Sequence, residues 1–421
     1  MFSTFYPTTG RAALTYSAYE MTHAMMMPIR NFARSVDHVA SHPANPFSKL
    51  PLNAAVRASW RVIDELTQRY AKPEFGIDSV DIDGVNVPIT EEVVIREPFC
   101  NVVRFTKSGP AARPGPTVLI VAPLSGHFAT LLRGTVKAMI PEHDVYITDW
   151  ADARAVPYVK GTFDLHDYVD YLVDFFRRLG PDLHVLAVCQ PSVAALAATA
   201  IMAEENELCQ PRSLTLMAGP VDTASNPTAV NDYAMDHSMD WFKSNVITIV
   251  PFPNAGAMRP VYPGFLQLAG FMGMNADSHM QAYSNYFDKL VEGASDDVAA
   301  HRRFYDEYLS VLDLTAEFFL QTVDLIFHQR VMAERKFMHR GQLVDCTSIR
   351  NTVLFTVEGE RDDICGLGQT EAAHDLCSSL TNEQRHHYVQ EGVGHYGVFN
   401  GRRWRETIQP KIADVIKSAE R

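Results

Sequence analysis

Three short apolar runs, each long enough for one buried strand, most constrain how this chain of 421 residues can fold. They are TVLIVAP (117–123), DVYITDW (144–150) and HVLAVC (184–189). A continuous aliphatic and β-branched run indicates a strand covered on both faces, as in parallel sheets flanked by helices. An amphipathic helix from Asp164 to Leu179 separates the last two runs. The sequence therefore predicts alternating strands and helices.

The same alternation predicts how the rest of the chain is organised. Later strands are expected at 213–222, 351–359 and 385–392, whereas the stretch between the first and second of these is mainly helical in pattern. We expect an α/β fold with a doubly wound, mostly parallel sheet, in which the helical insertion covers the strand ends as a lid. The expected parts are an N-terminal helical extension (1–78), a first core part (79–222), the lid (223–350) and a second core part (351–421).

The N-terminal extension should contain two amphipathic helices. An apolar stripe at steps of three and four predicts the first helix, and the second is expected from about Ala54 to Tyr70. Pro28 should kink the first helix or divide it into two. A stripe of this kind more often packs into a core, but its methionines would also suit an irregular apolar partner. The stripe consists of Leu14, Ala18, Met21, Met25, Ile29, Phe32, Val36 and Val39.

Charge and composition exclude several functions. The net charge of −13 argues against a nucleic-acid partner, which would require a basic surface. Residues 1–72 nevertheless carry eight Lys/Arg against four Asp/Glu, which indicates either attachment to an anionic surface or an ordinary helical extension. The six cysteines form no metal-binding or disulfide pattern. With no signal peptide and no apolar run long enough for a transmembrane helix, we expect a soluble protein of the cytoplasm.

A candidate nucleophile follows the third strand. In LAVCQPS, Cys189 lies between a buried strand and an apolar helix, where a nucleophile elbow would raise a side chain above the sheet. The flanking Ala187 and Pro191 depart from the usual glycines, and a lone cysteine at a strand end is more often a core residue. Ser192 should lie in the helix and point into packing. The elbow therefore needs support from other motifs.

That support comes from two motifs near the C-terminus. VEGERDDI places Asp362 after a late strand at the spacing of a catalytic acid, with Asp363 as the alternative. EGVGHYGVF places His395 in a loop that two glycines make tight. The order nucleophile, acid, histidine is that of the α/β-hydrolase fold. His395 would take the thiol proton and return it to the leaving alkoxide, while the acid orients the imidazole ring.

The loop after the first strand, APLSGHFATLLRG, is where this fold supplies an oxyanion donor. The first donor would be the backbone N–H of Gln190, which follows the nucleophile. We expect the second from Ser125, with Leu124 as the alternative. His127 could line the site or serve the structure alone.

These motifs together closely resemble those of the intracellular polyhydroxyalkanoate depolymerases. The resemblance covers about residue 40 to the C-terminus and is weaker over residues 1–20. It implies hydrolysis of amorphous poly(3-hydroxybutyrate) granules without a metal or dissociable cofactor, with the granule surface and granule-coat proteins as partners. It also implies Cys189, Asp362 and His395 as nucleophile, acid and base. The motifs are VCQPS (188–192), APLSGHFATLLRGTV (122–136), ITDWADARAVP (147–157), VEGERDDICGLGQTEAAH (357–374) and GVGHYGVFNGRRW (392–404).

Three other functions remain open at the level of sequence. A polyhydroxyalkanoate synthase shares the fold and the cysteine, although Ala187 and Pro191 differ from the glycines usual in synthases. A small-ester or thioester hydrolase of the same fold is the second alternative. An inactive granule-coat protein is the third, and the complete Cys–Asp–His set argues against it. Neither the oligomeric state nor the choice of water or CoA as acyl acceptor follows from the sequence.

Overall fold

One large mixed sheet forms the centre of the molecule. In the computed structural model, which describes residues 10–42, 44–46, 50–274 and 276–420, this sheet has nine strands. Their spatial order is β1 (Ser79–Ile82), β2 (Val85–Arg96), β3 (Cys100–Lys107), β5 (Asp144–Trp150), β4 (Thr117–Val121), β6 (Leu183–Val188), β7 (Ser213–Met217), β13 (Val353–Gly359) and β14 (Arg385–Gln390). The strands from β5 to β14 are parallel. This order, with β5 between β3 and β4, is that of the α/β-hydrolase fold, and the predicted fold class is confirmed.

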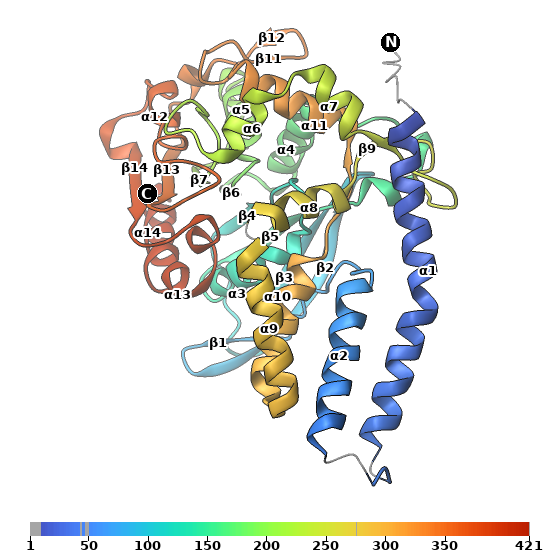
Figure 1. The fold of residues 1–421 in the computed structure, drawn as a ribbon. Coiled ribbons are helices and arrows are strands. Elements are labelled where there is room, and N and C mark those ends of the chain that lie inside the picture. Colours follow the sequence, from blue (N-terminus) through green and yellow to red (C-terminus); the bar gives the residue numbers. More distant parts are fainter. Residues whose placement is uncertain (1–9, 43, 47–49, 275, 421) are drawn as a thin grey trace.

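Helices cover both faces of this sheet (Figure 1). α4 (Leu165–Leu179) and α5 (Ser192–Glu204) pack together on one face, while α3 (Arg133–Met139) and α14 (Gln409–Ala419) lie against the other. The helix expected after Asp164 is α4, which begins at a reciprocal cap between Asp164 and Asp167. Shorter helices are α12 (Ala373–Leu376), α13 (Gly401–Arg403) and the π-helical turn η8 (Trp404–Ile408).

The first three strands differ from the expected alternation. β1, β2 and β3 pair antiparallel, and β3 pairs antiparallel with β5, with no helix between them. β2 alternates buried and exposed residues over part of its length, as an antiparallel strand with one solvated face does. The strand–helix alternation therefore begins at β4, although the predicted first core part begins at residue 79.

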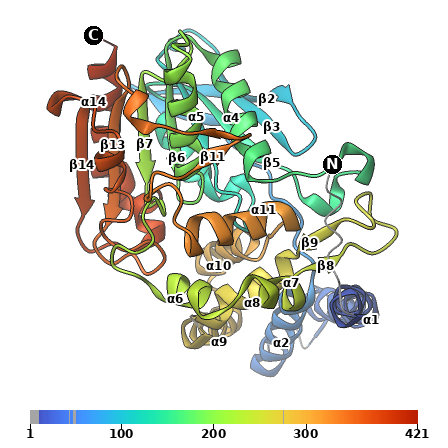
Figure 2. The same cartoon turned by 90° about the horizontal axis from the view of Figure 1, so that it is seen from above.

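The chain between β7 and β13 is mainly helical, as expected, and also contains small sheets. Figure 2 shows the arrowheads of β7, β13 and β14 pointing towards the side where α6, α8 and α10 lie. The helices are α6 (Ala229–Asp236), α7 (Met239–Asn245), α8 (Gly264–Met274), α9 (Ala276–Glu292), α10 (Ser295–Tyr308), α11 (Ala316–Gln321) and the π-helix η4 (Thr322–His328). β8 (Thr248–Ile249), β9 (Pro260–Tyr262) and β10 (Leu314–Thr315) form one small sheet, and β11 (Met338–His339) pairs with β12 (Gln342–Leu343).

Two long helices form a hairpin at the N-terminal side of the chain (Figure 1). α1 (Gly10–Ser41) is one helix with Pro28 inside it, so the alternative of two separate helices is wrong. α2 (Pro51–Thr67) packs between α1 and α9. Tyr16 anchors α1 to the body, because its hydroxyl donates a hydrogen bond of 2.6 Å to the buried carboxylate of Asp313. No described helix has the length and apolar character needed to cross a bilayer.

The apolar stripe of α1 does not pack into a core, so that expectation is wrong. Met21, Met25 and Phe32 on the stripe are all more than half exposed. Most of α1's charged side chains instead turn towards α2, where Asp37 pairs with Arg57 and Arg61. The arginines of this region therefore act mainly within the hairpin and do not form a free basic surface.

Candidate active site

Cys189 lies at a sharp turn between β6 and α5. Every residue of β6 is buried, and the backbone of Cys189 adopts a φ of 66°, which a residue with a side chain rarely adopts. The turn is held by two hydrogen bonds, from the N–H of Cys189 to the carbonyl of Met217 (2.7 Å) and from the N–H of Ser192 to the carbonyl of Cys189 (3.1 Å). The side chain of Cys189 is half-buried and packs against the core's edge. This is the geometry of a nucleophile elbow.

The close approach that the elbow requires is provided by Gly219, which the sequence reasoning missed. A Cβ on Gly219 would lie 2.0 Å from Oγ of Ser192 and 3.0 Å from the carbonyl oxygen of Cys189. Gly219, which follows the neighbouring strand β7, therefore leaves room for Ser192 and for the backbone of Cys189. Ser192 is fully buried at the start of α5, as expected, and cannot reach a substrate without repacking.

Asp362 follows β13, and its carboxylate is held on several sides. The backbone N–H groups of Ile364 (2.9 Å) and Cys365 (2.8 Å) donate hydrogen bonds to Oδ1. The other oxygen, Oδ2, lies 2.8 Å from Nδ1 of His395, and the carboxylate is shielded from solvent. Asp363 is exposed. The structure thus pairs Asp362, and not the alternative Asp363, with the histidine.

His395 begins a tight helical turn, η7 (His395–Val398), after Gly392 with φ of 70° and Gly394. Its ring is buried and hydrogen-bonds to the Cys189 side chain as well as to Asp362. Burial alone lowers the pKa of His395, but its electrostatic interaction with Cys189 and the hydrogen bond with Asp362 outweigh it and raise the pKa to about 10. The structure therefore brings Cys189, His395 and Asp362 into one hydrogen-bonded chain.

Two backbone N–H groups near the thiol are available for a developing oxyanion. In the described part of the chain, no acceptor lies within hydrogen-bonding distance of the N–H of Gln190 or of Ser125. The N–H of Leu124, the alternative donor, is directed to the side-chain oxygen of Gln190 at 3.4 Å. The geometry thus favours Ser125 over Leu124 as the second donor.

The contacts of His127 support a structural role for this residue. Its Nε2 lies 3.1 Å from the carbonyl oxygen of Tyr308, and its ring stacks on Phe271 of α8 at 5.3 Å. Burial lowers the pKa of His127 to about 4, against the opposing hydrogen bond with Tyr308. A neutral histidine fixed between the lid and the loop holds the loop's shape, which is the structural alternative that the sequence left open.

The mainly helical segment between β7 and β13 is bonded directly to this loop. The N–H of Leu312 donates a hydrogen bond of 2.7 Å to the carbonyl of Gly126, and Val311 pairs with His127 as an isolated β-bridge. Gly126 has φ of 116°, and a Cβ there would lie 2.7 Å from Oε1 of Gln267 in α8. A larger residue at position 126 would be strained by this φ and would displace the side chain of Gln267.

Glu358, near the end of β13, is a second residue that the sequence reasoning missed. Its buried carboxylate accepts hydrogen bonds from the N–H groups of Gly368 (2.9 Å), Thr370 (2.7 Å) and Glu371 (3.1 Å). Thr370 in turn bonds to the backbone of Gly219 through its hydroxyl (2.8 and 3.0 Å). Glu358 therefore ties the loop after Asp362 to the elbow. A carboxylate inside an apolar strand run was the signal that could have identified it.

A metal centre is not supported by these side chains. Among the described residues, one group of three possible ligands has its atoms within 4.8 Å of one another: Glu358, Glu371 and His387. Glu358 already accepts three backbone hydrogen bonds, so its oxygens serve the loop and do not lie open towards an ion.

Comparison with known proteins gives a family for the C-terminal half. Residues 218–420 match the family described as "PHB de-polymerase C-terminus". No curated protein sequence matches the chain. Among solved structures, the chain is similar to a thermophilic esterase from Thermogutta terrifontis (11% identity, TM-score 0.41, covering 82% of this chain and 98% of the other). It is also similar to an esterase from Pyrobaculum calidifontis (10% identity, TM-score 0.40, covering 90% and 95%).

The family match covers Asp362 and His395, whereas the elbow precedes it. The assignment of the fold rests on the strand order of the sheet. The strand order therefore gives this chain the α/β-hydrolase fold, and its residues 218–420 match the PHB de-polymerase C-terminus family.

Proposed function

We propose that this chain hydrolyses the ester bonds of amorphous poly(3-hydroxybutyrate) in the cytoplasm, with Cys189 as nucleophile. The observation that carries the proposal is the hydrogen-bonded chain from Cys189 through the buried His395 to Asp362, at a turn with positive φ. The family match of residues 218–420 supports the polyester as substrate. No metal or cofactor is required, because thiol, imidazole and carboxylate supply the nucleophile, the proton carrier and its orientation.

In the first half of the reaction, the Cys189 sulfur attacks the ester carbonyl carbon and the carbonyl oxygen becomes negatively charged. The N–H groups of Gln190 and Ser125 donate hydrogen bonds to that oxygen. The C–O bond of the ester then breaks, and protonated His395 gives its proton to the leaving alkoxide. The products of this half are an alcohol-ended polymer fragment and a thioester on Cys189.

In the second half, His395 removes a proton from water as the water oxygen attacks the thioester carbonyl. The same two N–H groups stabilise the second oxyanion. The C–S bond breaks, the free carboxylic acid leaves, and the proton held by His395 is shared again with the thiolate. Asp362 keeps the ring in one tautomer through both halves, because its hydrogen bond fixes Nδ1.

The proposal is tested by the products formed from protein-free amorphous poly(3-hydroxybutyrate) particles, with and without CoA. Oligomers of 3-hydroxybutyrate with free carboxylates are expected, and acid quenching should trap an acyl group on the peptide that contains Cys189. Thioesters of CoA would indicate acyl transfer. Polymer formed from hydroxybutyryl-CoA would indicate a synthase, and turnover of soluble esters alone would indicate a small-ester hydrolase. If the Cys189→Ala variant broke down particles as fast as the wild type, the chain would have to be assigned a non-catalytic role at the granule.

A further inference from the structure

The outward face of α1 presents apolar side chains along most of its length. We call this set the α1 stripe; its members are between 43% and 68% exposed. From its first to its last residue the stripe extends roughly 38 Å at the rise of an α-helix. Exposed apolar patches of this extent usually mark an interaction site. The members are Leu14, Met21, Met25, Ile29, Phe32 and Val39.

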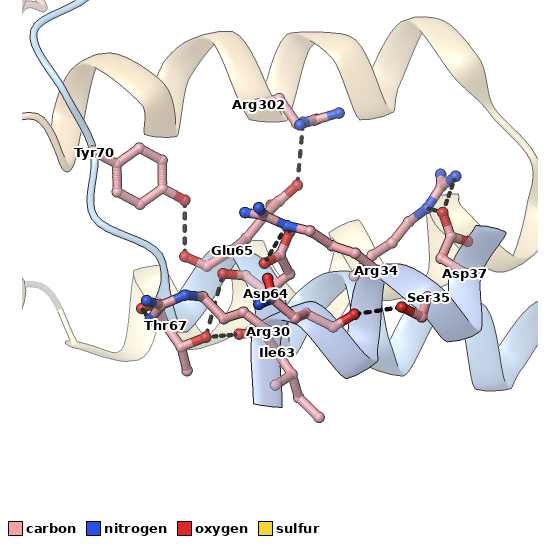
Figure 3. A network of polar contacts seen from close by, with 12 residues as sticks. Arg30, Arg34, Ser35, Asp37, Ile63, Asp64, Glu65, Thr67, Tyr70 and Arg302 are labelled. Carbon is pink, nitrogen blue, oxygen red and sulfur yellow. Dashed lines mark hydrogen bonds and ion pairs between the residues drawn. The ribbon is translucent and has the colours of Figure 1, made fainter. Parts of the chain in front are cut away.

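Most charged side chains of α1 turn away from this face. Asp37 accepts hydrogen bonds from Arg57 (2.9 Å) and Arg61 (2.9 Å) of α2. Figure 3 shows the neighbouring part of the network, in which Arg34 meets Asp64 at 3.0 Å and Glu65 meets Arg302 of α10 at 3.2 Å. The ion pairs therefore hold the hairpin together.

What remains on the outward face is uncharged over most of its length. Between Leu14 and Phe32, none of the described exposed side chains is acidic or basic. The hydroxyls of Thr22 and Ser35 donate back to helix carbonyls, at 2.9 and 2.8 Å, and so offer little to a polar partner. A face of this kind on a chain with a net charge of −13 fits an uncharged apolar surface.

We propose that the α1 stripe is the surface by which the enzyme rests on an amorphous polyester particle; this inference rests on the proposed function. The polymer has methyl and methylene groups and ester oxygens but no charge within the chain, so it requires no ion pairing. Methionine side chains are flexible and polarizable, which suits a surface without regular shape. The occupant is therefore the substrate phase itself.

Two other occupants fit the stripe less well. Binding to an anionic bilayer relies on free basic residues beside the apolar face, and here Arg34, Arg57 and Arg61 are paired with carboxylates. A second copy packed as a coiled coil requires apolar residues at both inward positions of each heptad. In the register that contains Met21, Met25 and Phe32, Pro28 and Ser35 fall at inward positions.

The position of α1 suits delivery of polymer to the site. Figures 1 and 2 place α2 between α1 and α9, and the rings of Tyr19 in α1 and Phe265 in α8 stack at 4.1 Å. Tyr16 ties α1 to Asp313, and the adjacent Leu312 bonds to Gly126 of the oxyanion loop. A particle held by α1 would therefore lie near the helical segment between β7 and β13, which contacts the oxyanion loop.

The test uses the full chain with Met21→Glu/Met25→Glu, compared with Val85→Glu/Leu208→Glu. The control adds the same charge at exposed apolar residues of the β1–β2 hairpin and of the loop before β7. We expect the α1 variant to bind protein-free amorphous poly(3-hydroxybutyrate) particles at least tenfold more weakly in sedimentation, a rough estimate from the lost burial of two methionines. Hydrolysis of a soluble 3-hydroxybutyrate oligomer should stay unchanged in both variants.

Particle binding by the α1 variant equal to that of the wild type would overturn the inference. So would a wild-type dimer that the α1 substitutions dissociate while particle binding persists, or binding to anionic phospholipid vesicles that the same substitutions abolish. A different result would test the proposed hydrolase function. Wild-type protein that binds particles through α1 but releases no oligomers would refute the hydrolase assignment and leave the docking surface intact.

Discussion

α5 and α1 are both rich in apolar residues, and the structure uses them in opposite ways. α5 is apolar all round and nearly every one of its side chains is buried beneath the elbow. α1 has one apolar stripe, which faces outward, while most of its charged groups pack inward against α2. The region of α5 is therefore stabilised by burial of a large apolar surface, whereas the hairpin combines a small apolar interface, which includes Ala33 and Ala58, with ion pairs and the anchor at Tyr16. The comparison shows that an apolar pattern identifies a helix but not the side on which its partner lies.

The largest expected effect is the loss of activity when Cys189 in the elbow is replaced, a change that should not affect the α1–α2 hairpin. Cys189→Ala removes the nucleophile, so kcat/KM for a soluble oligoester should fall by about 10⁴-fold or more, as for other triads. Particle binding through α1 should persist, which would separate chemistry from attachment. Ser192→Ala is the control and should keep most activity, because its hydroxyl is buried and has no partner within the described residues. A collapse of activity in the control would move the nucleophile to Ser192.

Equal truncations in the two helices should differ sharply in their effect on stability. Leu196 of α5 is fully buried, so Leu196→Ala should lower the free energy of unfolding by about 2–5 kcal/mol. Met25 of α1 is 68% exposed, and Met25→Ala should change that free energy by no more than about 0.5 kcal/mol. Denaturant unfolding of both variants measures the difference. A large loss from Met25→Ala would mean that the stripe is covered in solution by another copy.

The junction between the two regions should respond to pH. Burial and the charge of Asp152 raise the pKa of Asp313 from 3.8 to about 7, against the hydrogen bond from Tyr16. The folded state then keeps a proton that the unfolded state releases, so stability is lost as pH rises from about 4 to 7. Asp313→Asn cannot titrate and still accepts the N–H of Gly264, so its stability relative to wild type should improve from pH 5 to pH 8. A difference in the free energy of unfolding between Asp313→Asn and wild type that stays constant from pH 5 to pH 8 would contradict the raised pKa of Asp313.

Local patterns predicted the parts of the site that lie close to one another along the chain. The run 184–189 predicted β6 and the turn at Cys189, and the spacing from Gly359 selected Asp362 over Asp363. A short segment is sufficient for these predictions because strand, turn and helix are each set by neighbouring residues. The order of the three motifs then predicted the fold, and the strand order confirms it.

Features that depend on distant contacts could not be predicted in the same way. Gly219 matters only because β7 places it against Ser192, and Glu358 only because the chain returns to it at Thr370. The outward placement of Met25 is of the same kind, since a stripe has the same period whether it faces a core or solvent. Antiparallel pairing of β1 to β3 likewise depends on which strands meet, not on a local signal.

The smallest effect should come from an ion pair of the hairpin. Asp37→Asn removes the charge that pairs with Arg57 and Arg61, both partly exposed, so the free energy of unfolding should fall by only about 1 kcal/mol. Burial opposes ionisation of Asp37, but hydrogen bonds from Arg61 and Arg57 prevail and lower its pKa. The contribution of Asp37 is therefore present at neutral pH and is lost as pH falls through the lowered pKa. Added salt should reduce the difference between variant and wild type, whereas the cost of Leu196→Ala should not diminish, because salt screens charges and not apolar burial. Unfolding at low and high ionic strength measures both effects, and an equal salt response of the two variants would remove the physical distinction between the hairpin and the core.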